Sequence, residues 1–249
     1  MQSAKHTATY YAPPSDFNRH QVILRKEEAH HIRVSRNRVG DKIIVTDGRG
    51  HAYACNILKI GKNEVVATLN KQLPNTTEPD FSLTLAVAIP KKQRLEWIIE
   101  KGTEIGVNHF IPLLTTRTIT TTDSIKKPRL EKIALAATKQ SCRTTLPQIS
   151  DPISLSALLE QQHFDICLIA HEQPFLENER NLSQEAEMWK ASKTGVVAIG
   201  PEGGFTEAEM ETAVTSGWLP FWMGTRRLRT ETASIVAATL VLSRTGDLA

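Results

Sequence analysis

The second part of the sequence alternates short apolar runs with stretches of helical periodicity, and this alternation restricts the fold more than any other feature. The predicted strands are residues 83–89, 110–114, 166–170, 196–199 and 219–223. The predicted helices are residues 91–105, residues 130–141, a segment that opens at Thr206 and a segment that opens at Thr230. Strands that alternate with helices indicate a parallel sheet covered on both faces. Ligands of such sheets bind outside the carboxyl ends of the strands.

A cationic loop lies just ahead of the last predicted helix. Arg226, Arg227 and Arg229 fall within four residues, and Thr230 and Glu231 follow them. Thr230 is the predicted N-cap, because its hydroxyl can accept from free amides of the first turn. Glu231 places a negative charge in that turn, where the helix dipole favours it. A cationic loop at a helix N-terminus suits anionic or electron-rich ligands, and a solvated basic turn is the alternative interpretation.

A glycine-rich loop follows the predicted strand at residues 196–199. Gly200, Gly203 and Gly204 lie between this strand and a helix that Thr206 and Glu209 open as a predicted capping box. Glycine lets a backbone turn sharply and lets a ligand approach it closely. A tight turn without a ligand is the alternative. If both loops lie at one edge of the sheet, they are expected to form one pocket.

Residues 10–72 indicate a small β-rich domain with one helix at about residues 26–36, and residues 73–79 are the predicted linker. Residues 1–72 hold 12 Lys or Arg and 6 Asp or Glu, a balance of +6, whereas residues 73–249 hold 18 and 21, a balance of −3. A basic small domain beside a mildly acidic large one suggests an anionic polymer as partner. Chance surface charge is the alternative.

Several classes are excluded by missing patterns. The sequence has no G-x-x-x-x-G-K-[ST] loop, no G-x-G-x-x-G fingerprint and no G-x-S-x-G elbow, which argues against a P-loop NTPase, a common dinucleotide enzyme and a serine hydrolase. The three cysteines are widely spaced, so that neither a metal site nor a disulfide framework is expected. No run of about 18 apolar residues occurs, and the polar first ten residues predict no secretory signal. A cytoplasmic protein is expected.

Three motifs then carry a family resemblance that covers nearly the whole chain. They are residues 199–206 (IGPEGGFT), residues 224–233 (GTRRLRTETA) and residues 91–107 (KKQRLEWIIEKGTEIGV). Weaker support comes from residues 31–36 with Gly40 and Asp41, and from residues 140–143 with Pro147. The chain resembles the bacterial 16S ribosomal RNA uridine-N3 methyltransferases of the RsmE type, within the SPOUT superfamily. The first two motifs together are highly specific.

The resemblance implies an α/β fold in which a small PUA-like β-barrel precedes a SPOUT-type, trefoil-knotted parallel-sheet domain. Residues 1–74 would be the RNA-binding domain, and residues 75–249 the methyltransferase domain with S-adenosylmethionine bound in the knot. The enzyme would be a homodimer that methylates N3 of a specific uridine in 16S ribosomal RNA of the small subunit. No metal would be needed. Arg227 and Lys139 depart from the family pattern, in which an aliphatic and an acidic residue are usual.

The resemblance also implies roles for particular residues. The cofactor would contact Ala170, His171, Ile199, Gly200, Gly203, Gly204, Met223, Gly224, Leu228, Arg229, Thr230 and Ala233. Arg229 or Arg226 would stabilise negative charge on the uracil, and Glu231 or Glu202 would accept the proton. A second interpretation makes Glu231 only a first-turn carboxylate. RNA contacts are expected from Arg25, His31, Arg33, Arg36, Arg38, Lys91, Arg94 and Arg143.

Two other functions remain open. One is a non-catalytic RNA-binding protein with a vestigial cofactor pocket, against which the retained Arg226, Arg229 and Glu231 argue. The other is a SPOUT methyltransferase that acts on a different RNA. A phosphotransferase is disfavoured, because the glycine loop lacks a nearby lysine and metal-binding carboxylates.

Overall fold

The computed structural model describes residues 8–91, 93–122, 125–161, 163–172, 189 and 191–248. The chain divides into two compact units. The first contains residues 1–78 and 138–146, and the second contains residues 79–137 and 147–249. The first unit therefore includes a segment from the second half of the sequence, which a single predicted boundary at residue 74 leaves out.

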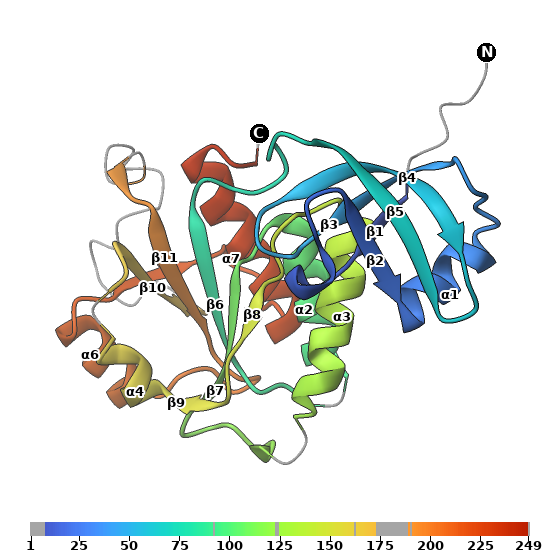
Figure 1. Ribbon diagram of the computed structural model, residues 1–249. Helices are drawn as coiled ribbons and strands as arrows, with labels where there is room; N and C mark the ends of the chain where they lie inside the picture. Colours follow the sequence, from blue (N-terminus) through green and yellow to red (C-terminus); the bar gives the residue numbers. More distant parts are fainter. Residues whose placement is uncertain are drawn as a thin grey trace. The chain divides into compact units, whose positions relative to one another are not determined.

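A curled five-stranded sheet forms the first unit (Figure 1). In spatial order its strands are β1 (Thr9–Tyr11), β3 (Lys42–Thr46), β4 (Ala52–Ile60), β5 (Glu64–Gln72) and β2 (Gln21–Arg25). Neighbouring strands are antiparallel except β1 and β3. The 3-10 helix η1 (Pro14–Asp16) precedes β2, and α1 (Lys26–Val34) follows it. Two register shifts between β4 and β5 bend the sheet, and Tyr10, Leu24, Ile32, Val45 and Ile57 form part of its core.

The segment at residues 138–146 is bound into the first unit by polar contacts. Thr145 forms an isolated antiparallel bridge with Arg49, and the Thr46 hydroxyl donates to the Thr144 carbonyl at 2.9 Å. The Arg143 guanidinium is 2 % exposed and donates to the Glu78 carboxylate at 2.7 Å. A buried charge is tolerated only when it is paired in this way, so this contact fixes the segment.

A parallel sheet forms the centre of the second unit, as the alternation of strands and helices predicts. Its strands are β6 (Ser82–Ala88), β7 (His109–Leu114), β8 (Gln148–Ile149), β9 (Ile153–Ser154), β10 (Ile166–His171), β11 (Thr194–Ile199) and β12 (Leu219–Trp222). The order is β12-β10-β11-β6-β7-β8, β9 pairs with β7, and every pairing is parallel.

Helices cover both faces of this sheet (Figure 1). The helices α2 (Arg94–Ile105), α3 (Lys127–Gln140) and α7 (Thr230–Thr245) pack on one face, where Leu83, Leu85 and Val87 of β6 point. The helices α4 (Leu155–Leu159) and α6 (Glu207–Thr215) pack on the other face, toward which Ala86 points. Alternate residues of one strand therefore enter two separate cores, which explains why the strand is apolar throughout.

Of three helix ends predicted from the sequence, two are correct and one is wrong. Gly106 caps α2 with a φ of 112°, as expected, and Thr206 and Glu209 form the predicted capping box of α6. The N-cap of α7, however, is Arg229, which makes no side-chain cap, and Thr230 is the first helical residue. The short elements β8, β9 and α4 went unpredicted, because two to five residues are too few to carry a periodicity.

Candidate active site

A pocket of the second unit opens where β10, β11 and β12 end. Its empty volume is about 1020 Å³, open mouth included. Ala170 and His171 come from the end of β10, Ile199 and Gly200 from the end of β11, and Met223 from just beyond β12. The carboxyl ends of parallel strands meet at one edge, so the pocket lies where such sheets bind ligands.

The two loops do not come from neighbouring strands, although they follow strands that are consecutive in the sequence. In the sheet, β10 separates β11 from β12. The glycine loop after β11 and the arginine loop after β12 therefore flank the end of β10. The expectation of one shared pocket holds because β10 supplies its central wall.

Glycine backbone forms part of the wall. Gly204 has a φ of +68° and Gly224 a φ of +104°, a region that residues with a side chain rarely adopt. A Cβ added at either position would meet no atom of the described residues within 4 Å, apart from the chain neighbours of the glycine. Both glycines line the pocket, so the space is open and the bare backbone is accessible to a ligand.

A weak contact joins the two loops. The Thr230 hydroxyl, at the start of α7, donates to the Gly200 carbonyl at 3.4 Å. Thr230 and Ala233 are buried, and both line the pocket. All residues expected at the cofactor line the pocket except Arg229.

The arginine loop contributes three guanidinium groups of different character. Arg226 and Arg227 line the pocket, whereas Arg229 is not among the lining residues and is the N-cap residue of α7. Arg227 is 81 % exposed and donates to the Glu172 carboxylate at 2.7 Å. A charged side chain therefore fits at this position, where the family pattern has an aliphatic residue. Arg226 and Arg229 are exposed, and across the described part of the chain the structure assigns neither guanidinium group a protein partner.

Two carboxylates predicted as proton acceptors meet at one arginine. Arg94 of α2 donates to Glu202 at 2.9 Å, and its Nε lies 3.6 Å from Glu231 Oε1. Glu202 lines the pocket and its side chain is 39 % exposed, whereas that of Glu231 is 17 % exposed. Glu231 Oε2 is buried and accepts no hydrogen bond from the described residues. The guanidinium of Arg94 therefore pairs with carboxylates, and its side chain stays 32 % exposed.

Arg117 is a pocket residue that the sequence motifs did not indicate. It lies on the segment after β7, and it donates to the carbonyls of Gly203 and Phe205 at 2.6 and 3.2 Å. Its place in the pocket depends on contacts with residues 86 and 88 positions away in the chain, so no local pattern marks it.

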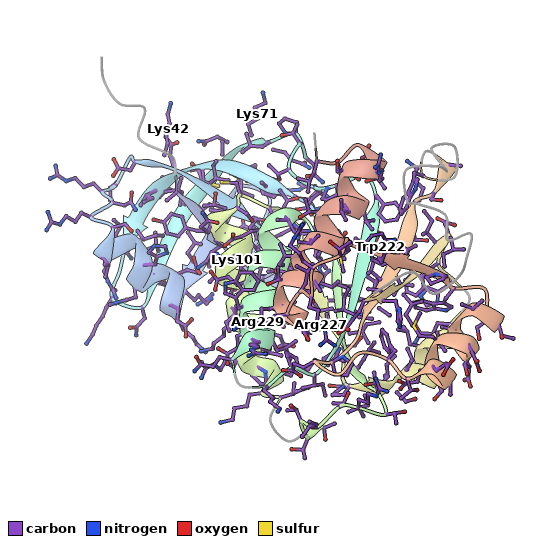
Figure 2. The ribbon with its side chains drawn as sticks, turned by 180° about the vertical axis from the view of Figure 1, so that it is seen from behind. Lys42, Lys71, Lys101, Trp222, Arg227 and Arg229 are labelled. Carbon is purple, nitrogen blue, oxygen red and sulfur yellow. The ribbon has the colours of Figure 1, made fainter. Side chains whose placement is uncertain are left out.

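The residues expected to contact RNA fall into different environments. His31, Arg36, Arg38 and Lys91 are exposed. Arg25 is also exposed but pairs with Asp16 and Glu64, at 3.1 and 3.3 Å. Figure 2 shows the side chains of Lys42 and Lys71 pointing outward from the five-stranded sheet.

Two more of the arginines expected to contact RNA, in addition to Arg25 and Arg94, have protein partners. Arg33 donates to the backbone carbonyls of Gly61 and Lys62. The expectation for Arg143 is wrong, because a guanidinium that is 2 % exposed and paired with Glu78 has no surface for RNA. Lys139, the second departure from the family pattern, pairs with the Glu28 carboxylate within the first unit.

Neither a metal-binding cluster nor a membrane-spanning helix occurs among the described residues. No group of three or more His, Cys, Asp or Glu side chains there is arranged to hold a metal ion. No described helix has the length and apolar character needed to cross a membrane.

The fold and the pocket define the class of protein. Residues 77–242 match the RNA methyltransferase domain family, and residues 24–70 match the RNA methyltransferase PUA domain family. The chain is thus an RNA methyltransferase by fold and domain content. It is 34 % identical over 226 residues to the Ribosomal RNA small subunit methyltransferase E of Bacillus subtilis (strain 168), with 88 % of each chain covered. The chain belongs to the ribosomal RNA small subunit methyltransferase E family.

Solved structures agree with this assignment. The crystal structure of a ribosomal RNA small subunit methyltransferase E from Neisseria gonorrhoeae, bound to S-adenosyl methionine, superposes with a TM-score of 0.85 at 26 % identity. The superposition covers 96 % of this chain and 98 % of the Neisseria gonorrhoeae chain. A putative methyltransferase from Legionella pneumophila in complex with the same cofactor gives a TM-score of 0.81 at 26 % identity, over 95 % and 97 % of the two chains. The predicted α/β fold class is confirmed.

Proposed function

We propose that this protein transfers the methyl group of S-adenosylmethionine to N3 of a uridine in the RNA of the small ribosomal subunit. One observation carries the proposal. A single pocket at the ends of three parallel strands combines bare glycine backbone and an accessible carboxylate with an arginine loop, in which two guanidinium groups have no partner among the described residues. The ribosomal RNA methyltransferase family to which the chain belongs supports the reaction class.

The lining of the pocket suits a cofactor of this chemistry, because small-molecule sites combine apolar side chains with a few placed polar groups. Glycine backbone at residues 200, 203, 204 and 224 would read the adenine and ribose through main-chain groups, with Ala170, Leu228 and Ala233 as apolar neighbours. Bound S-adenosylmethionine supplies an electrophilic methyl group on a positively charged sulfur. The protein's part is to hold the uracil nitrogen in line with that methyl group.

The arginine loop would stabilise the uracil anion. Loss of the N3 proton spreads negative charge over the two uracil oxygens, and guanidinium donors lower the energy of such an anion. Arg226 lies in the pocket wall and Arg229 one residue before Thr230, which also lines it. Both are exposed, so that both are available to a base.

Glu202 is the better placed proton acceptor. It lines the pocket and is partly exposed, so a uracil N3–H can reach it. Arg94 donates to the Glu202 carboxylate at 2.9 Å, and the Glu231 carboxylate lies 3.6 Å from Arg94 Nε. In this proposal Glu202 takes the N3 proton and releases it to solvent, while Glu231 orients Arg94.

The remaining expectations from the family belong to the same proposal. Residues 1–74 bind RNA and residues 75–249 carry out the transfer, with the cofactor loops threaded as a trefoil knot. The enzyme works as a homodimer in the cytoplasm, on RNA of the small subunit. Trp97 on α2 is 43 % exposed, and large exposed aromatic residues are frequent at protein interfaces.

A methyl-transfer assay tests the proposal. Small-subunit RNA from cells that lack this protein is incubated with tritium-labelled S-adenosylmethionine, and the modified base is identified by mass mapping. Arg229→Ala and Glu202→Gln should lose transfer while S-adenosylhomocysteine still binds in a calorimeter, and Glu231→Gln should lose less than Glu202→Gln. Arg129→Ala, which removes an exposed ion pair with Glu96 elsewhere in the unit, is the matched control.

Each alternative gives a different result. A wild-type protein that binds RNA but has no affinity for S-adenosylhomocysteine would be a non-catalytic binding protein. Methyl transfer to another RNA, or to another atom of the base, would replace the proposed substrate. Full activity of Glu202→Gln would remove Glu202 as the proton acceptor.

A further inference from the structure

Hydrogen bonds from Arg117 join the segment after β7 to the glycine loop after β11. Arg117 follows β7, whereas the glycine loop follows β11, and β6 lies between these strands. One terminal nitrogen of Arg117 donates to the carbonyls of Gly203 and Phe205, at 2.6 and 3.2 Å. Arg117 is exposed, so it is not needed to fill the core.

Glu209 makes a second hydrogen-bonded link between the segment after β7 and the residues that follow the glycine loop. Its carboxylate accepts from the Thr116 amide at 2.8 Å and from the Thr206 amide at 2.8 Å. Burial raises the pKa of this carboxyl, but the hydrogen bonds from Thr116 and Thr206 outweigh it, so that its pKa lies below the ordinary value. The charged form is therefore the one that joins the segments.

Four carbonyl groups of the glycine loop accept hydrogen bonds, including the two that Arg117 contacts. The carbonyl of Pro201 accepts from the Gly204 amide at 2.9 Å, and that of Gly200 accepts from Thr230. In contrast, no protein acceptor within the described residues is assigned to the amides of Glu202 and Gly203, both of which line the pocket. A backbone amide that has no protein partner seeks an acceptor in solvent or in a ligand.

We propose that Arg117 is a positioning residue of the cofactor site. By holding the carbonyls of Gly203 and Phe205, it keeps the amides of the glycine loop turned toward hydrogen-bond acceptors of the cofactor. The proposal rests on the proposed function, because it names the residue that organises the loop for S-adenosylmethionine. Arg117 acts through the loop and contacts neither the methyl group nor the uracil.

The test separates cofactor affinity from turnover. Arg117→Ala is expected to raise the Kd for S-adenosylhomocysteine about ten-fold, which is the effect of losing one charge-assisted hydrogen bond. The KM for S-adenosylmethionine should rise in parallel, while kcat at saturating cofactor stays close to that of the wild type. Arg117→Lys should recover part of the affinity, because an ammonium can also donate to two carbonyls. Arg129→Ala is the matched control, since it removes an exposed arginine from the same unit.

Each outcome supports or overturns the proposal. Unchanged affinity in Arg117→Ala overturns it, and so does a fall in kcat with unchanged affinity, which would mean that Arg117 acts on the RNA. If Arg117→Ala does not fold, Arg117→Gln replaces it, because glutamine keeps one donor without the charge. A wild-type protein that binds no S-adenosylhomocysteine overturns the proposed function itself, whereas wild-type binding with an unaffected variant overturns only the role of Arg117.

Discussion

A single methyl group added at Gly224 should affect cofactor binding and folding stability by different amounts, so that the two effects can be measured separately. Gly224 has a φ of +104° and lines the pocket, and a Cβ there would have no atom of the described residues within 4 Å beyond its chain neighbours. Gly217 is a matched control outside the pocket, because it has a φ of +85° and equally free space around a Cβ. The variants Gly224→Ala and Gly217→Ala therefore introduce the same strain at two functionally different places.

The expected loss of stability follows from the backbone. A left-handed conformation costs a residue with a Cβ about 1–2 kcal/mol. Alanine also restricts the unfolded chain, which offsets about 0.4–1 kcal/mol of this cost. Because no protein atom needs to move in either case, both variants should lose about 0.5–1 kcal/mol and melt about 1–4 °C lower.

The effect on binding should differ between the two variants. At Gly224 the added methyl group stands in the space proposed for the cofactor, and forcing an extra methyl into a filled site costs about 1–3 kcal/mol. Gly224→Ala should therefore weaken binding of S-adenosylhomocysteine about ten-fold to a hundred-fold. Gly217→Ala should bind as the wild type does.

Isothermal titration calorimetry and thermal melting measure the two effects separately. Equal affinity of Gly224→Ala and Gly217→Ala would refute the placement of the cofactor against Gly224. Equal melting temperatures of Gly224→Ala and the wild type would refute the strain argument.

Three further predictions follow from other parts of the chain. Arg143→Ala should lower the free energy of unfolding of its unit by about 3–5 kcal/mol in urea titrations, because Glu78 is left buried and unpaired; a loss below about 1 kcal/mol would refute a structural role for this pair. The depressed pKa of Glu209 means that its carboxylate stabilises the fold above the unfolded-state value of about 4.3, and that this contribution is lost as pH falls through the folded-state pKa. Glu209→Gln should therefore melt lower than the wild type at neutral pH and converge with it in acid; a constant difference across the pH range would contradict the linkage. Arg38→Ala should make the negative slope of log affinity for RNA against log salt concentration shallower by about 0.7–0.9. An unchanged slope would show that Arg38 contacts no phosphate.

Local patterns in the sequence determined the class of the fold and the main binding elements. Apolar runs that alternate with helical periodicity predict a parallel sheet, because strands buried on both faces are apolar throughout. The capping box of α6 is correct because Thr206 and Glu209 satisfy each other's backbone groups within one turn. The same local reasoning failed for Thr230, whose hydroxyl donates to Gly200 in the neighbouring loop and caps no helix.

The pairing of functional groups could be decided only by the tertiary structure. Arg94 reaches Glu202 across 108 positions, and Arg117 reaches Gly203 across 86. The sequence alone does not distinguish Arg143 from a surface arginine. Its burial and its ion pair with Glu78 are seen only in the folded structure. Helical and strand periodicities extend over a few residues, so they identify which side chains lie on one element but not which elements meet. The strand order β12-β10-β11 brought the two loops together around β10, and that order is set by the packing of the whole sheet.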